Sequence, residues 1–98
     1  MMAKKLEIEV NRNDLHLDPK MFSKGDILSF EDSSEVIYFI GKTTFVTAKY
    51  HLYDDYISVK NYSYKNGALD LNCARSRLIN ENDKAAKKYK NLLSRSLH

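Results

Sequence analysis

Apolar and polar residues alternate at the start of the chain, which is the pattern of a half-buried strand. Leu6, Ile8 and Val10 are separated by glutamates, so one face of this segment is apolar. Short runs of β-branched and aromatic residues predict further strands at 26–30, 35–40, 43–50 and 56–64. The run from 35 to 40 is apolar on both faces, which is typical of a central strand or of one that turns a corner in a small barrel. Before these runs, Asp18-Pro19 predicts one capped helical turn, which Gly25 ends.

The dipeptide Asn66-Gly67 predicts a type I′ hairpin at the end of the last strand. The implied register pairs Lys65 with Ala68, Tyr64 with Leu69 and Tyr62 with Leu71, and the face of Tyr62, Tyr64, Leu69 and Leu71 is expected to be buried. Ile57 and Val59 have the opposite parity, so they would face away from that core. We therefore predict a β-bulge near Lys60-Asn61; without it, the strand would bend and change core.

The C-terminal segment has the periodicity of an amphipathic helix. Its apolar positions fall in an arc about 140° wide; they are Ala85, Ala86, Tyr89, Leu92, Leu93 and Leu97. We favour a main helix from about Glu81 to Leu97, preceded by a helical turn or a short helix. Leu78 and Ile79 extend the apolar arc backwards, so a helix that begins near Ala74 is the alternative.

These elements predict one α+β domain over residues 1–98, mainly β in 1–73 and a basic helix in 74–98. The expected fold is a small twisted antiparallel sheet, or a partly open SH3-like barrel, of five to six strands followed by the amphipathic α-helix. The segment Phe22-x-x-Gly25-Asp26-Ile27-Leu28-Ser29-Phe30, followed by Ile37-Tyr38-Phe39-Ile40-Gly41-Lys42, resembles the opening strands of SH3-like barrels of the KOW and Tudor type. This resemblance concerns the fold alone.

Composition and charge narrow the class of protein. The chain has 98 residues, 43% hydrophobic and 30% charged, which suits one globular domain. Residues 1–73 contain nine basic and eleven acidic side chains, whereas residues 74–98 contain seven basic and two acidic ones. The net charge of +3 therefore gathers at the C-terminal end, which favours nucleic acid or an acidic protein surface as the partner.

Location is predicted from the cysteine count and from the absence of targeting patterns. Cys73 is the one cysteine in the sequence, so an intramolecular disulfide or a cysteine-cluster zinc site is excluded. The N-terminus lacks the apolar region of a signal peptide, and no run approaches the ~18 apolar residues that span a bilayer. We expect a cytoplasmic protein, in the host cytoplasm if it is viral, that does not bind membranes.

Several motifs suggest chemistry but lack the residues that the chemistry needs. Gly41-Lys42-Thr43-Thr44 lacks the first glycine of a phosphate-binding loop, and a strand rather than a helix follows it. Cys73 is expected to be a small buried apolar residue rather than a nucleophile with His51 as its base. The acidic side chains of 31–35 lie around a turn, where nothing would shift their pKa values. We expect no enzyme, no metal site and no cofactor.

The basic helix carries the strongest functional pattern. Lys84, Lys88, Asn91 and Arg95 recur at helical spacing on one stripe, and Lys87 flanks them. Acidic residues occur only in the first turn of the predicted helix, so the stripe suits phosphates. Aromatic side chains in the loop before residue 56, together with a nearby lysine, suit base stacking. The candidate binding residues are Lys84, Lys87, Lys88, Asn91, Arg95, Lys49, Tyr50 and Tyr53.

The sequence leaves three hypotheses for the function. The first is a non-enzymatic module that binds nucleic acid through the basic helix and the nearby tyrosines. The second is a small virus-encoded protein that binds and inhibits or modulates a host enzyme or defence system, using the helix or the acidic turn at 31–35. The third is self-assembly, for example into a homodimer. The contact would use exposed sheet edges or Leu92, Leu93 and Leu97.

Overall fold

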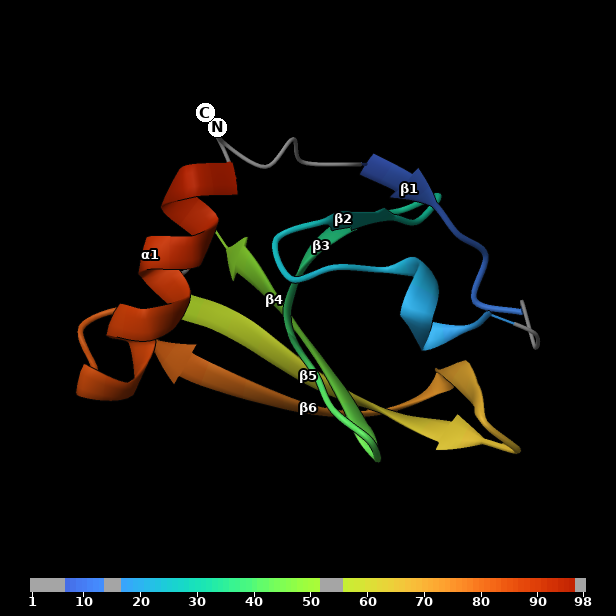
Figure 1. The fold of residues 1–98 in the computed structure, drawn as a ribbon. Helices are drawn as coiled ribbons and strands as arrows, with labels where there is room; N and C mark the ends of the chain where they lie inside the picture. Colours follow the sequence, from blue (N-terminus) through green and yellow to red (C-terminus); the bar gives the residue numbers. More distant parts are fainter. Residues whose placement is uncertain (1–6, 14–16, 52–55, 97–98) are drawn as a thin grey trace.

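One sheet organises the molecule (Figure 1). The computed structural model describes residues 7–13, 17–51 and 56–96. Within these residues, six strands lie side by side in chain order: β1 (Glu7–Glu9), β2 (Ile27–Ser29), β3 (Ser34–Ile40), β4 (Thr44–His51), β5 (Tyr56–Lys65) and β6 (Ala68–Asn80). The predicted antiparallel pairing is confirmed from β2 to β6, but β1 runs parallel to β2. The sheet is therefore mixed and open, and it does not confirm an SH3-like barrel.

Three short helical elements accompany the sheet. The predicted turn at Asp18-Pro19 is confirmed as the 3-10 helix η1 (Pro19–Met21), where the Asp18 carboxylate accepts a hydrogen bond from the Lys20 amide at 2.9 Å. The C-terminal segment forms the 3-10 helix η2 (Lys84–Ala86) and continues as α1 (Lys87–Ser96). Within the described residues, no helix combines the length and the apolarity that crossing a bilayer requires.

The predicted helix start was wrong at both proposed positions. Residues 74–80 belong to β6, because they pair with β5 from Tyr62 back to Tyr56 and so fill their backbone hydrogen bonds with a neighbouring strand. Helical structure begins only at Lys84. Asp83 serves as its N-cap, since its carboxylate accepts a hydrogen bond from the Ala85 amide at 3.0 Å.

The β5–β6 hairpin turns as predicted and then departs from the predicted register. Asn66 and Gly67 have φ values of 54° and 80°, as a type I′ turn requires. Lys65 pairs with Ala68 and Tyr64 with Leu69, which confirms the register next to the turn. The predicted pairing of Tyr62 with Leu71 is wrong. Tyr62 pairs with Ala74 while Ser63 pairs with Asp70, so β6 carries an irregularity at residues 71–73.

The predicted bulge near Lys60-Asn61 is also absent. β5 pairs with β4 without interruption from Tyr56 to Ser63, so side chains of opposite parity point to opposite faces of the sheet. Each face has its own core. The helix-side core consists of Val36, Ala48, Ile57, Val59, Ile79, Ala86, Tyr89 and Leu93. The loop-side core consists of Phe22, Leu28, Phe30, Ile37, Phe45, Tyr62, Leu69 and Leu71.

The segments that pack over the two cores lie towards different ends of the sheet. In Figure 1, α1 stands beside the start of β5, and the segment with η1 stands nearer the β5–β6 hairpin. Tyr62 and Leu69 are buried as predicted, and Tyr64 is half-buried. One strand thus supplies Ile57 and Val59 to the helix-side core and Tyr62 to the loop-side core.

Candidate binding surface

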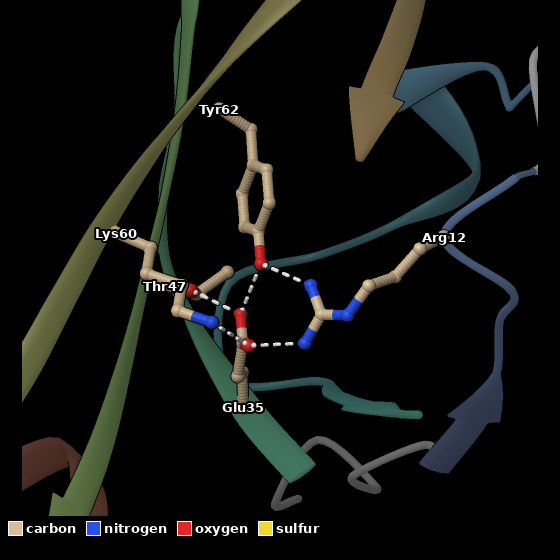
Figure 2. Close-up of polar contacts among 5 residues, drawn as sticks. All are labelled: Arg12, Glu35, Thr47, Lys60 and Tyr62. Carbon is tan, nitrogen blue, oxygen red and sulfur yellow. Dashed lines mark hydrogen bonds and ion pairs between the residues drawn. The ribbon is translucent and has the colours of Figure 1, made fainter. Parts of the chain in front are cut away.

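A buried carboxylate stands at the centre of the loop-side face (Figure 2). Glu35 is 1% exposed, and its Oε1 accepts hydrogen bonds from the Tyr62 hydroxyl at 2.6 Å and the Thr47 hydroxyl at 2.8 Å. Its Oε2 accepts one from the Lys60 ammonium at 3.0 Å and lies 3.5 Å from an Arg12 guanidinium nitrogen. Alternation along β3, β4 and β5 brings these side chains to one face, and Arg12 reaches them from the segment after β1.

The donors around Glu35 decide its protonation state. Burial by itself raises the pKa of Glu35, but the hydrogen bonds from Tyr62, Thr47 and Lys60 outweigh burial and hold the pKa below its ordinary value. Burial and the bond to Glu35 raise the pKa of the Tyr62 phenol. A carboxylate whose two oxygens are each engaged by two partners, and which water cannot reach, stabilises the fold and has no oxygen free to act on a ligand.

Glu35 lies in a strand, as predicted for residues 35–40, and is the second residue of β3. The expectation that nothing beside the turn would shift its pKa was wrong, because Glu35 is almost fully buried and hydrogen-bonded. Tyr62 and Lys60 at alternate positions of β5 were a signal, because they supply a hydroxyl and an ammonium to one face. The register that places them opposite Glu35 was not visible in the sequence.

The helical part of the C-terminal segment carries the predicted basic stripe. Ala86, Tyr89 and Leu93 are buried against the sheet, whereas Lys84, Lys87, Lys88 and Asn91 are exposed. Both ion pairs found among the described residues end on Glu35, so these lysines have no carboxylate partner there. The backbone of Arg95 lies in α1, and its side chain is outside what the structure describes.

The acidic residues before the helix are occupied by other donors. Glu81 accepts a hydrogen bond from the Tyr50 hydroxyl, and Asp83 caps η2. A shallow hollow lies between these residues and the first turns of the helix, where Lys84, Lys87 and Lys90 line it with Asn91. The cations at this end of the molecule thus remain available to a partner.

Two further predicted site residues, Tyr50 and Lys49, lie on opposite faces of the sheet. Tyr50 is half-buried against the helix-side core, so it lies on the same face of the sheet as α1. Lys49 is the next residue and therefore points to the loop-side face, away from the helix. Tyr53 lies outside the described residues. The predicted set is therefore not one surface: Tyr50 joins the helix cations and Lys49 does not.

Two arginines on β6 were missed as members of this surface. Arg77 pairs with Val59 and Arg75 with Asn61, so both point to the face that carries α1, and both are exposed. The sequence analysis gave their segment to a helix or a helical turn, which hid this placement. Cys73, expected to be buried, is exposed on the same strand.

Two of the leucines proposed for a helix-mediated dimer pack within the chain. Leu93 is 3% exposed in the helix-side core and Leu92 packs against that core, while Leu97 lies outside the described residues.

The turn Gly41–Thr44 links β3 to β4 through a hydrogen bond from the Gly41 amide to the Thr44 carbonyl at 2.8 Å. A strand follows it, as the sequence predicted for this motif.

Comparisons with protein-family models, with curated proteins and with solved structures return no match for this chain. The function is therefore inferred from the geometry and charge of the described residues.

Proposed function

We propose that the protein is a non-enzymatic binding module that binds nucleic acid through the cations of η2 and α1. The observation that carries this proposal is the set of exposed lysines at positions 84, 87 and 88 on ordered helical structure. They have no carboxylate partner within the described residues, because both ion pairs found there belong to Glu35. Ammonium groups at helical spacing that have no carboxylate partner suit the regularly spaced charges of a phosphate backbone.

Neighbouring groups support the same assignment. Asn91 continues the stripe and offers an amide that can donate to phosphate or to a base edge. Arg75 and Arg77 extend the positive surface from the helix onto β6. Glu81 and Asp83, the nearest acidic residues in the sequence, already accept hydrogen bonds from Tyr50 and from the Ala85 amide.

We extend the proposal to the type of fold and to the place of action. The region from Phe22 to Lys42 resembles the opening strands of SH3-like barrels, and this resemblance concerns the fold and not the function. The proposed place of action is the cytoplasm, where the exposed thiol of Cys73 stays reduced.

The test measures binding of labelled oligonucleotides by fluorescence anisotropy at low salt. The triple variant Lys84→Ala, Lys87→Ala, Lys88→Ala should bind all sequences at least about tenfold more weakly than the wild type, because three phosphate contacts are lost. The matched control replaces Lys20, Lys42 and Lys65, which are equally exposed but lie outside the helical segment. It removes the same charge and should change the affinity by less than about threefold.

Two results would contradict the proposal. One is equal weakening by both triple variants, which would make net charge rather than the helix responsible. The other is no binding to any DNA or RNA, together with retention of one protein partner from a nuclease-treated lysate, which would favour an acidic protein surface as the ligand.

A further inference from the structure

An exposed aromatic ring lies beside the helix on the same face of the sheet. The β3–β4 register shifts between Ile37 and Phe39, so β3 has an extra residue, Tyr38, at this point. Tyr38 packs against the helix-side core, and its ring centroid lies 4.6 Å from that of Tyr89 in α1. Phe39 pairs with Val46, a neighbour of the same core, and is 50% exposed. The two consecutive aromatics therefore share the helix-side face.

The Phe39 ring packs against a glycine. A Cβ atom added to Gly41 would lie 2.6 Å from the Phe39 ring, so the ring rests directly on that backbone. The ring is nevertheless half exposed, so part of its surface stays open to a stacking partner.

A row of directly paired residues runs from Phe39 across the sheet. Phe39 pairs with Val46, Val46 with Asn61 and Asn61 with Arg75, so all four side chains point to the helix-side face. The adjacent row towards α1 ends in Arg77, and its members on β3, β4 and β5 belong to the helix-side core. The Phe39 row is thus the first one beyond that core, and it combines a ring, an amide and a guanidinium.

Cations border this row on the side of the helix. The ammonium of Lys24 lies 5.2 Å from the Tyr38 ring centroid, and that of Lys88 lies 5.2 Å from the Tyr89 centroid. Both lysines are exposed, and Lys88 belongs to the basic stripe already described. In the next row outwards, Ser63 pairs with Asp70, whose carboxylate keeps its charge and accepts a hydrogen bond from the Asn72 amide at 3.0 Å. Because Arg75, Lys24 and Lys88 outnumber this one carboxylate, the row continues the positive surface of the helix onto the sheet.

We propose that the row Phe39, Val46, Asn61 and Arg75, bordered by Lys24 and Lys88, is a platform for single-stranded nucleic acid. Phe39 stacks on one base, Asn61 donates to or accepts from a base edge, and Arg75 and the lysines contact phosphates. A base inside a duplex has both faces covered by its neighbours, so only an unpaired strand can present one to a ring on a sheet. This inference rests on the proposed function and names its substrate class.

The test compares a labelled 12-nucleotide oligo-dT with a blunt 12-base-pair duplex, using anisotropy at one salt concentration. The wild type should prefer the single strand by about tenfold or more. Phe39→Leu keeps an apolar side chain on Gly41 but removes the ring, and it should weaken single-strand binding about tenfold with little effect on the duplex. Phe39→Tyr keeps the ring and should retain the affinity. Tyr56→Leu removes an exposed ring from the opposite face and should change neither affinity.

The outcomes separate this inference from the proposed function. Tighter binding to the duplex, or equal affinity of Phe39→Leu and the wild type for oligo-dT, overturns the platform while the helix proposal stands. Phe39→Leu could lose binding and also have a lowered melting temperature. That result would show a structural role for Phe39 and counts against the platform, unless Phe39→Tyr restores both the binding and the melting temperature. No binding to either probe, with association of the wild type in sedimentation, overturns both proposals and makes the face a contact between copies.

Discussion

Glu35 is the buried charge of the loop-side face. Its charge is removed from water, and among the described residues it is offset by the Tyr62 and Thr47 hydroxyls and by the cations of Lys60 and Arg12. Arg12 also packs over the Phe30 ring at 4.0 Å, so the network fastens the segment after β1 to the sheet. A buried ion pair contributes little compared with an apolar substitute, but removing one partner leaves the others uncompensated.

Replacing Glu35 by Gln should lower the free energy of unfolding by about 3 kcal/mol, because Lys60 and Arg12 lose their counter-charge. Urea denaturation followed by circular dichroism measures the change. Glu31→Gln is the matched control, since Glu31 is exposed and should shift stability by no more than about 0.5 kcal/mol. Equal effects of the two substitutions would show that the network does not stabilise the fold.

The pKa of Glu35 also sets a pH dependence. Its folded pKa is held below the ordinary value, whereas the unfolded chain titrates near pH 4.3. The stabilisation is therefore complete above the unfolded pKa and is lost as the pH falls through the folded pKa. Between about pH 5 and pH 2, the wild type should lose more unfolding free energy than Glu35→Gln. A Glu35→Gln variant with the same acid dependence as the wild type would contradict this reading, while Glu31→Gln should behave like the wild type.

At the scale of elements, α1 is held by its apolar face rather than by its own length. A helix of ten residues is marginal in isolation, so packing of Ala86, Tyr89 and Leu93 on β3, β4 and β5 must stabilise it. The cations on its outer face are ordered only while this packing lasts.

Leu93→Ala should therefore cost roughly 2–5 kcal/mol of unfolding free energy, because a buried side chain is replaced by a cavity. Urea denaturation and the helical signal in circular dichroism measure the loss, and nucleic-acid affinity should fall with it. Leu78→Ala provides the control, since Leu78 is 63% exposed and its truncation should cost less than about 0.5 kcal/mol. A helix that keeps its full signal in Leu93→Ala would show that other contacts dock it.

Local patterns predicted the elements whose determinants lie next to one another in the sequence. Alternation located β1, runs of β-branched and aromatic residues located β2 to β5, Asp18-Pro19 the first helical turn and Asn66-Gly67 the hairpin. The segment 74–80 suited a helical arc as well as a strand, and pairing with β5 decided the outcome. Helical spacing also located the lysines of the proposed binding surface, whereas Phe39 and Arg75 share a face only through two intervening strands.

At the scale of the molecule, charge is graded across the sheet. Exposed Glu7 and Glu9 lie on β1 at one edge, and exposed Arg75 and Arg77 lie on β6 at the other. The cations of η2 and α1 lie on the helix-side face, where η2 contacts β6 and α1 contacts β3 and β4. A polyanion should therefore approach the helix-side face of the sheet.

The salt dependence of binding tests how many cations take part. If about four phosphates are neutralised, the logarithm of the affinity for a single strand should fall with the logarithm of salt concentration at a slope near −3. The Lys84, Lys87 and Lys88 triple variant should reduce the slope to about −1, since three contacts are lost. The triple variant of Lys20, Lys42 and Lys65 should keep the wild-type slope. A slope near zero for the wild type would rule out phosphate contacts as the source of affinity.

The division of β5 between two cores constrains how this protein can evolve. Val59 and Tyr62 lie on one uninterrupted strand but face opposite sides of the sheet. Gaining or losing one residue between them would move the side chains of half of the strand to the opposite face. Single side chains can therefore be substituted on this strand, but its number of residues cannot change. Insertions and deletions that survive in descendants of this chain will therefore collect in the turns, and β5 will retain its span.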